Sequence, residues 1–311
     1  MPKYKIIVNP ISGRGAGQKS IPILEQLLSA DQFQYDLVVT QRPWHACELA
    51  LQAAQDGFTA VIAVGGDGTA NEVLNGLMQA RLTGINIPAM GILGVGRGND
   101  FAYAMQVPAT LEEGIKILKD DFRKKIDVGH VEGGLYPQGR YFGNGVGIGF
   151  DAVVGFEALK LAPLSGFLSY IVAALKTIFL YFNAPRVKID LDSETLVQPA
   201  LMVSIMNGRR MGGGFMMAPE SLPGDGVFDI CIVGQVSRTG IFALIPRFMK
   251  GTQKDHPAIH FSRSAKVSIT AIEGTLPAHA DGETLCTEGK SLSMKIIPQV
   301  VEMICSQPQK R

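Results

Sequence analysis

The stretch AVIAVGGDGTANEVLNGL, residues 60–77, constrains the fold more than any other part of the chain. Its first part, residues 60–64, is a short apolar run of the kind that lies inside a parallel sheet. Its last part, residues 71–77, places valine and leucine at helical spacing. The five residues between them, Gly65–Thr69, are therefore predicted to turn a buried strand into a helix.

The composition of this corner suits a phosphate ligand. Glycine tolerates positive φ and lets a bulky anion approach the backbone, and the amides at a helix start attract phosphate. Asp67 would repel a bare phosphate, but it suits a nucleotide that carries Mg²⁺, which a carboxylate holds directly or through water. The alternative is an ordinary turn in which Asp67 caps the helix.

Two more glycine-rich loops follow predicted strands, at residues 9–17 (NPISGRGAG) and 94–100 (GVGRGND). Three such loops at the carboxyl ends of one parallel sheet are expected to line one crevice, where doubly wound folds bind ligands. The first loop is not a P-loop, because Gln18 separates Gly17 from Lys19. A Rossmann dinucleotide site is disfavoured, because Gln18 also replaces the last glycine of that motif.

The pattern of strands and helices predicts two domains in the α/β class. Strands are expected at 5–8, 36–40, 60–64 and 89–93, and helices at 20–29, 43–55, 71–77 and 111–119. We expect an N-terminal doubly wound α/β nucleotide-binding domain at 1–128, to which 299–311 returns. Residues 129–298 are rich in β-branched and alternating runs, which predict an antiparallel β domain with helices only near 164–182 and 239–250.

The apolar segment 161–182 is long enough to be scanned as a membrane span. A surface helix is favoured instead, because Lys176 lies well inside it. The expected apolar face comprises Leu164, Leu168, Ile171, Leu175, Ile178 and Phe182, with Ser169, Lys176 and Thr177 elsewhere around the helix. That face is expected either to pack in a core or to cover a cleft that accepts lipid.

Charge and cysteine content exclude several functions. Lys and Arg number 29 against 28 Asp and Glu, so the net charge of +1 argues against general nucleic-acid binding. The four cysteines form no CxxC pair, so neither a zinc site nor a disulfide framework is indicated. The N-terminal MPKYKIIVNP shows no secretory signal, and a cytoplasmic location is expected.

Two acidic segments stand out in the second domain. In APESLPGDGVFDI, residues 218–230, Asp225 either forms a turn or joins backbone carbonyls in a cation site, since hard cations prefer oxygen ligands. In HADGETL, residues 279–285, Asp281 and Glu283 flank a glycine. The plainer interpretation of that segment is a pair of exposed hairpin acids.

Taken together, these segments resemble the diacylglycerol kinase catalytic family. In chain order they are an NPxSG loop, GGDGT with NEVLNGL, GNDFA, PxxxxxDGxFD and a late DGE, and the resemblance runs from about residue 4 to residue 305. The resemblance is strongest to the soluble bacterial lipid kinases, which are related to sphingosine kinases and more remotely to NAD kinases. It implies a β-sandwich fold for the second domain, which accepts the lipid, and an ATP·Mg²⁺ site in the cleft between the domains.

The resemblance also implies site residues. Nucleotide contacts are expected from Asn9, Pro10, Ile11, Ser12, Gly13, Thr40, Gly65, Gly66, Asp67, Gly68, Thr69, Ala70, Asn71 and Arg97. Arg97 stands where relatives commonly have a threonine, and its guanidinium could grip a phosphate or point to solvent.

Acidic residues carry the remaining expected roles. Asp67 would organise the Mg²⁺–phosphate cluster and Glu283 would act as general base. A structural Mg²⁺ would be held by Leu222, Asp225 and Val227, through two carbonyls and the carboxylate of Asp225. Asp100 and Asp127 would connect that metal by water to the nucleotide side.

The implied activity is transfer of the γ-phosphate of ATP to a lipid hydroxyl, with diacylglycerol as the expected acceptor and phosphatidic acid as the product. A sphingoid base or another lipid is the first alternative acceptor. A soluble-substrate kinase of the NAD kinase kind and a non-catalytic nucleotide- or lipid-binding protein are the others. Peripheral membrane contact is expected where the lipid is bound, and an edge strand could pair in a homodimer.

Overall fold

The computed structural model describes residues 3–29, 33–161, 167–181 and 184–307. The chain divides into two compact units, the first comprising Met1–Ile126 with Gln299–Arg311 and the second Asp127–Pro298. Strands β5 (Arg123–Gly133) and β16 (Ser291–Ile304) each contribute residues to both units.

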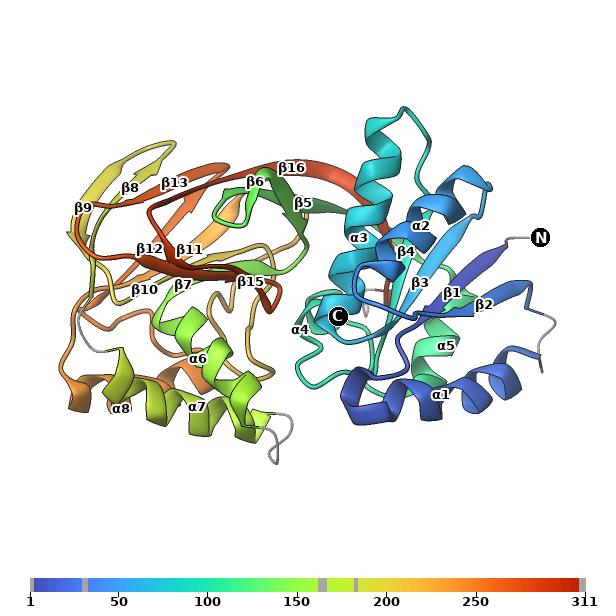
Figure 1. Ribbon diagram of the computed structural model, residues 1–311, viewed down its shortest axis with the longest axis horizontal. Coiled ribbons are helices and arrows are strands. Elements are labelled where there is room, and N and C mark those ends of the chain that lie inside the picture. The colour runs from blue at the N-terminus through green and yellow to red at the C-terminus, as the bar shows by residue number, and fades with distance from the viewer. Residues whose placement is uncertain (1–2, 30–32, 162–166, 182–183, 308–311) are drawn as a thin grey trace. The chain divides into compact units, whose positions relative to one another are not determined.

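The first unit is a parallel sheet with helices on both faces (Figure 1). Its other elements are β1 (Tyr4–Val8), α1 (Ser12–Ser29), β2 (Tyr35–Val39), α2 (His45–Gln55), β3 (Ala60–Gly65), α3 (Asp67–Leu82), β4 (Ala89–Gly94), α4 (Asp100–Ala104) and α5 (Leu111–Asp120). The strand order is β2-β1-β3-β4-β16, with parallel pairing throughout. Helix α1 packs with α5 on one face, and α2 packs with α3 on the other.

Burial explains why these strands are apolar rather than alternating. Every residue of β3 is buried, and the side chains of Ile6, Ile62 and Val64 are fully inaccessible to solvent. A sheet covered on both faces requires apolar side chains on both sides of each strand. The predicted doubly wound α/β fold is confirmed for this unit.

Two helices begin earlier than the sequence pattern predicts. The regular part of α1 begins directly after Gly15, where three left-handed residues end, rather than near residue 20, and α3 starts at Asp67 rather than residue 71. The short helix α4 was not expected. In α1 and α3, the glycine-containing first turn has low helix propensity and lacks apolar residues at helical spacing. The apolar periodicity therefore could not predict that the helix includes this turn.

The second unit contains two antiparallel sheets. Its other elements are β6 (Tyr136–Phe142), β7 (Gly145–Gly149), α6 (Phe150–Lys160), α7 (Phe167–Leu180), β8 (Arg186–Leu191), β9 (Thr195–Pro199), β10 (Met202–Met206), β11 (Phe228–Val233), α8 (Arg238–Lys250), β12 (Ile259–Ser264), β13 (Lys266–Ala271), β14 (Leu276–Ala280) and β15 (Glu283–Gly289). One sheet has the order β12-β11-β10-β7-β14-β15. The other has β16-β13-β8-β9, and β5 pairs with both β16 and β6.

A single apolar core lies between these two sheets. It includes Ile205 and Ile230 from the six-stranded sheet, together with Phe142, Val267 and Ile269 from the other sheet. The predicted antiparallel β-sandwich is therefore confirmed.

Helices α6, α7 and α8 cover the outer face of the six-stranded sheet (Figure 1). Helix α6 was not predicted, because its sequence, FDAVVGFEALK, combines β-branched residues with a glycine directly after a glycine-rich strand. These features resemble a continuing β region, and the expectation of only two helices in this unit was wrong.

Helix α7 buries only part of the predicted face: Ile178 is fully buried, as predicted, but other predicted positions are exposed. Ser169 and Thr177 are fully buried, whereas Leu168 is 54% and Leu175 is 38% exposed. Thr177 satisfies its hydroxyl by donating to the carbonyl of Ala173 at 2.8 Å, so small side chains let this face pack closely. The predicted positions Leu164 and Phe182 lie outside the described residues. Larger apolar side chains of α7 consequently face solvent.

Candidate active site

The carboxyl ends of four strands meet at one edge of the parallel sheet in the first unit. The backbone N–H of Thr40, after β2, donates to the carbonyl of Val8 at 2.8 Å. The N–H of Asn9 donates to Val64 at 2.9 Å, and the N–H of Val95 donates to Gly65 at 2.9 Å. Backbone hydrogen bonds thus join the ends of neighbouring strands at the edge of the sheet where the crevice is predicted.

The turn from β3 to α3 is tighter than predicted. The helix begins at Asp67, so Gly66 alone lies between the two elements. Neither Gly65, Gly66 nor Gly68 has positive φ, which corrects the expected reason for these glycines. Close approach is the reason instead: a Cβ on Gly65 would lie 2.3 Å from the hydroxyl of Thr69, and one on Gly66 would lie 3.2 Å from the Cα of Gly96.

The first glycine loop does adopt the left-handed conformation. Gly13, Arg14 and Gly15 have φ of 56°, 59° and 89°. A Cβ on Gly13 would lie 2.0 Å from the carbonyl oxygen of Val95, so this loop is pressed against the loop that follows β4. Left-handed glycines permit a turn and a backbone approach that other residues would block.

Two asparagines stabilise these loops, Asn9 by a contact with α3 and Asn99 within its own loop. Asn9 donates from its side chain to the hydroxyl of Thr69 at 3.0 Å and accepts from the N–H of Ile11 at 3.2 Å. Asn99, in the left-handed conformation, accepts from the N–H of Gly96 at 2.9 Å and donates to its carbonyl at 3.1 Å. Asn99 was not among the predicted site residues, although an asparagine between glycine and aspartate is a common turn former.

The first turn of α3 is only partly accessible. Thr69, Ala70 and Asn71 are buried, and Asn75 donates to the side-chain oxygen of Asn71 at 3.1 Å. Within α3 the first backbone N–H groups have no intrahelical partner, as at any helix start. The predicted nucleotide contacts of this segment would therefore use its backbone rather than these buried side chains.

Asp67 and Asp100 converge on Gly98. Asp67 accepts from the N–H of Phe101 at 2.9 Å, and Gly66 rather than Asp67 occupies the N-cap position of α3. A Cβ on Gly98 would lie 2.9 Å from an oxygen of Asp67 and 3.2 Å from an oxygen of Asp100. Two carboxylates at one glycine make an oxygen-rich environment, which is the donor chemistry that Mg²⁺ prefers.

Arg97 lies next to this acidic pair and is half-buried. Among the described residues, its side chain takes part in no hydrogen bond or ion pair. Its assignment as a nucleotide contact stays a prediction.

The two acids of the DGE segment have opposite environments. Asp281 and Gly282 form the two-residue turn between β14 and β15, both with positive φ, as Asp-Gly hairpins require. Asp281 is only 5% exposed and accepts from the N–H groups of Gly143, Asn144 and Gly145 at 2.8, 3.0 and 2.9 Å. The interpretation of both acids as exposed was wrong for Asp281, whereas Glu283 is exposed at the start of β15.

The turn that carries Asp225 is held by acids and an arginine. The carboxylate of Asp127 accepts from the N–H of Gly226 at 2.7 Å. Asp225 accepts from the N–H of Val227 at 3.3 Å and forms an ion pair with Arg263, which also lies 3.3 Å from Asp229. The sequence pattern gave no sign that Arg263 would reach this turn, because the two segments are distant in the chain.

Asp225 and the carbonyls of Leu222 and Val227 remain the predicted ligands of a structural Mg²⁺. The carbonyl of Leu222 accepts from the N–H of Gly224 at 2.8 Å, and Arg263 already supplies positive charge to Asp225. No cluster of three or more His, Cys, Asp or Glu side chains suited to a metal occurs among the described residues. No catalytic step is assigned to a metal at this turn.

Comparison with known proteins identifies the family. Residues 3–131 match the diacylglycerol kinase catalytic domain, and residues 144–305 match the YegS C-terminal NAD kinase beta sandwich-like domain. The chain therefore belongs to the family of kinases that combine these two domains.

Named relatives span nearly the whole chain. A diacylglycerol kinase of Bacillus subtilis (strain 168) is 28% identical over 286 residues, which cover 91% of this chain and 90% of the relative. A diacylglycerol kinase of Staphylococcus saprophyticus is 25% identical over 282 residues, covering 90% and 88%. A crystal structure of a candidate diacylglycerol kinase from Bacillus anthracis superposes with a TM-score of 0.80 at 26% identity, covering 98% and 95%.

An NAD kinase from Archaeoglobus fulgidus shares the fold, with a TM-score of 0.50 at 12% identity over 97% of this chain and 93% of that one. Its likeness concerns the fold alone. Within the part of the chain that the structure describes, no helix is both long enough and apolar enough to cross a membrane.

Proposed function

We propose that the protein is an ATP-dependent lipid kinase that transfers the γ-phosphate to a lipid hydroxyl. The observation that carries this proposal is the convergence of Asp67 and Asp100 on Gly98, at the edge where the strand ends of the first unit meet. Phosphoryl transfer needs little from a protein beyond positioning and the stabilisation of spread negative charge. Backbone amides and carboxylates that hold Mg²⁺·ATP meet that need.

Each group has a defined part in the proposed reaction. Amides of the Asn9–Gly13 loop and of the start of α3 bind phosphate oxygens, as helix N-termini do. Asp67 holds the Mg²⁺ that arrives with ATP, directly or through water, and Asp100 supports it. A Mg²⁺ held there would supply positive charge that offsets the charge of the phosphates.

Glu283 is proposed to accept the proton of the attacking lipid hydroxyl. Its exposure leaves it free to meet a substrate, whereas its neighbour Asp281 is fully engaged in holding the hairpin. General-base assistance of this kind contributes about 10²–10⁴-fold in rate.

Diacylglycerol is the proposed acceptor, giving phosphatidic acid. Support comes from the named relatives, which are 25–28% identical.

The outer surface of helices α6–α8 is proposed to contact the membrane. It exposes Leu159, Leu168, Leu175, Phe179, Leu180, Phe242 and Met249. Exposed basic residues on these helices include Lys160, Lys176, Arg247 and Lys250, while the two acids of α6, Asp151 and Glu157, are buried. An apolar surface with basic residues and no exposed acid on these helices complements an anionic lipid surface.

The proposal is tested by incubating the full chain with γ-labelled ATP, Mg²⁺ and a total lipid extract, followed by mass spectrometry of labelled products. A phosphorylated lipid is the expected result, and the Asp67→Asn variant should not form it. Label on NAD alone, or on no added acceptor, would overturn the lipid kinase assignment.

A further inference from the structure

The two-residue turn that precedes Glu283 is held from two sides. On one side, the carboxylate of Asp281 accepts from the backbone N–H groups of residues 143–145. On the other side, His279 Nδ1 accepts from the N–H of Gly282 at 3.3 Å. Gly282 directly precedes Glu283, so the bond to His279 fixes the peptide unit from which the proposed general base begins.

The ring of His279 can hold this turn in only one protonation state. His279 is buried on β14, where it pairs with Gly147 of β7 and with Thr284 of β15. Because Nδ1 accepts a hydrogen bond, the neutral ring carries its proton on Nε2. In the other neutral tautomer, or in the charged ring, Nδ1 would carry a proton and the bond to Gly282 would be lost.

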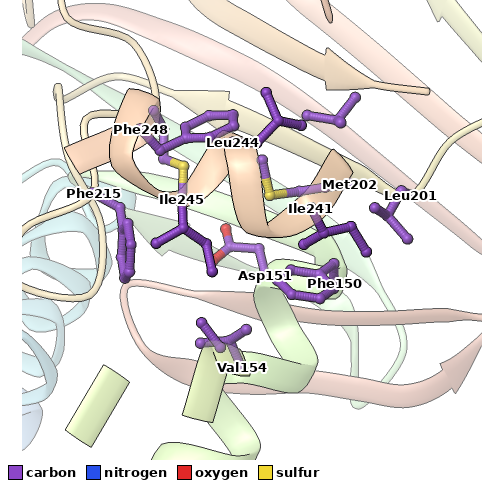
Figure 2. A pocket seen from close by; sticks show the side chains of 13 residues that line it. Phe150, Asp151, Val154, Leu201, Met202, Phe215, Ile241, Leu244, Ile245 and Phe248 are labelled. Atoms are coloured by element: carbon purple, nitrogen blue, oxygen red, sulfur yellow. The ribbon is translucent and has the colours of Figure 1, made fainter. Parts of the chain in front are cut away.

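Asp151 supplies the charge that favours the required tautomer. It lies in the first turn of α6, where the helix dipole favours a negatively charged side chain. Its carboxylate lies among apolar side chains (Figure 2), and its buried Oδ2 atom has no hydrogen-bond partner among the described residues. Oδ2 lies 3.8 Å from His279 Nε2, which is too long for a hydrogen bond but close enough for electrostatic attraction. A carboxylate at this position favours a proton on Nε2 over a proton on Nδ1.

Gly147 allows these two side chains to meet. A Cβ on Gly147 would lie 2.3 Å from Asp151 Oδ2 and 2.5 Å from His279 Nε2. Gly147 has no positive φ, so its backbone conformation does not require glycine. The close approach of the carboxylate and the ring is the physical reason for a glycine at this position.

We propose that His279 is a positioning residue for the general base: it sets the place of Glu283 through the N–H of Gly282, and Asp151 keeps its ring in the tautomer that this bond needs. The inference rests on the proposed kinase function and adds to it two buried residues that touch no substrate. A misplacement of about 1 Å can cost about 100-fold in rate. Loss of the His279 contact should therefore lower kcat without changing the affinity for ATP.

Three substitutions separate the hydrogen bond of His279 from the bulk of its ring. His279→Asn keeps an acceptor near the position of Nδ1, His279→Gln places its amide near the position of Nε2, and His279→Leu removes both. We expect kcat to fall about tenfold or more in His279→Leu and His279→Gln and to stay within about threefold of wild type in His279→Asn, with an unchanged KM for ATP. His260→Asn, at an exposed position on β12, is the control and should keep full activity. A wild-type kcat in His279→Leu would overturn the proposal, as would equal losses in His279→Leu and His279→Asn.

Double variants show whether His279 acts through the general base. In a Glu283→Gln background, His279→Leu should cause no further fall in kcat, because the carboxylate that it positions is gone. In the same way, Asp151→Asn should lower kcat in the wild-type chain but add nothing to the loss in His279→Leu. Multiplying losses in either combination would mean that the two residues act separately, and would overturn the proposal.

Gly147→Ala tests the same geometry without altering either side chain. The added methyl group must displace the Asp151 carboxylate or the His279 ring, both of which end in the space that it would occupy. We expect kcat to fall while the KM for ATP stays at the wild-type value. A wild-type kcat in Gly147→Ala would contradict the role given to the contact between Asp151 and His279.

Hydrogen–deuterium exchange gives a readout that does not depend on activity. The peptide that contains Gly282 should exchange faster in His279→Leu than in wild type and at the wild-type rate in His279→Asn, while β8 and β9 should be unchanged. Equal exchange of this peptide in His279→Leu and wild type would overturn the proposal. If the exchange pattern is found but the wild-type chain phosphorylates no lipid, the His279 contact holds and the kinase proposal fails. If lipid is phosphorylated and His279→Leu keeps the wild-type kcat, the kinase proposal holds and the assignment of His279 fails.

Discussion

Asp67 accepts a 2.9 Å hydrogen bond from the backbone N–H of Phe101, so the acid at the start of α3 also fixes the start of α4. Because of this contact, substitutions can separate the effect of the negative charge of Asp67 from its effect on the fold. Asp67→Asn keeps an acceptor oxygen for Phe101 but removes the charge that would hold Mg²⁺·ATP. Phosphate transfer should fall at least about 100-fold while the free energy of unfolding changes by less than about 0.5 kcal/mol.

Asp67→Ala is the matched comparison, because it removes both the charge and the acceptor. Leaving a buried donor without a partner costs about 1–3 kcal/mol, which urea unfolding would detect. Near-normal turnover in Asp67→Asn would remove Asp67 from the reaction.

Glu283→Gln should lower turnover by about 10²–10⁴-fold, because the amide cannot accept the proton of the attacking hydroxyl. ATP affinity and the Tm should stay at wild-type values, since Glu283 is exposed. Steady-state kinetics with ATP and lipid varied separately measure this effect. Glu288→Gln, at an exposed position on the same strand, serves as control and should retain full activity.

Asp281→Ala should act differently from Glu283→Gln, although the two residues share one turn. Asp281 satisfies three backbone N–H groups, and its loss should destabilise the second unit by about 2–4 kcal/mol. The expected signature is a lower unfolding midpoint, with activity lost in proportion to unfolding. A normal midpoint together with abolished turnover would instead assign Asp281 to the reaction.

The role of Asp225 is tested by following the Tm with and without Mg²⁺ at constant ionic strength and without ATP. If the predicted structural Mg²⁺ binds there, wild type should melt at a higher temperature with Mg²⁺, and Asp225→Ala should lose both this increment and Mg²⁺-dependent activity. Arg263→Ala should keep the increment, because it leaves the carboxylate intact. If Mg²⁺ does not change the wild-type Tm, the structural Mg²⁺ is excluded and Arg263 is the partner that neutralises Asp225.

Replacing Phe179 by Asp on the exposed face of α7 should weaken binding to anionic vesicles by about tenfold or more. A buried aromatic side chain contributes about 1.5–3 kcal/mol, and the new carboxylate is also repelled by the lipid. Vesicle co-sedimentation at low salt measures the change. Leu82→Asp is the control, because Leu82 is 70% exposed on α3 in the first unit. Equal binding by both variants would exclude this face as the contact surface.

The contacts of Glu157 predict that the stability gained by packing α6 on α7 depends on pH. It accepts hydrogen bonds from Lys160 at 2.6 Å and from Lys176 of α7 at 2.5 Å, and these lower the pKa of its carboxyl below the ordinary 4.5. A lowered folded-state pKa means stability that is present above pH 4.5 and is lost as pH falls through the folded-state value. Glu157→Gln should therefore cost about 1 kcal/mol at pH 7 and less at an acid pH below the folded-state pKa in urea unfolding. An equal cost at both pH values would contradict this ionic contribution.

The sequence by itself determined the fold class and the positions of the glycine-rich loops. Continuous apolar strands separated by helical spacing leave few choices other than a parallel sheet, and its loops must then emerge at one edge. The family followed from the order of five short motifs, because each motif sits at a turn where backbone geometry restricts the residue type. Helix α6 was not predicted, because its local sequence pattern does not show that it packs against a sheet.

Only the tertiary structure decided which acids face solvent and which are buried. Asp281 and Glu283 are two residues apart, yet one holds three amides and the other is exposed. The contact of Arg263 with Asp225 and the outward face of α7 depend on segments far apart in the chain. Local sequence sets the backbone, but burial and pairing arise from residues that meet only when the chain has folded.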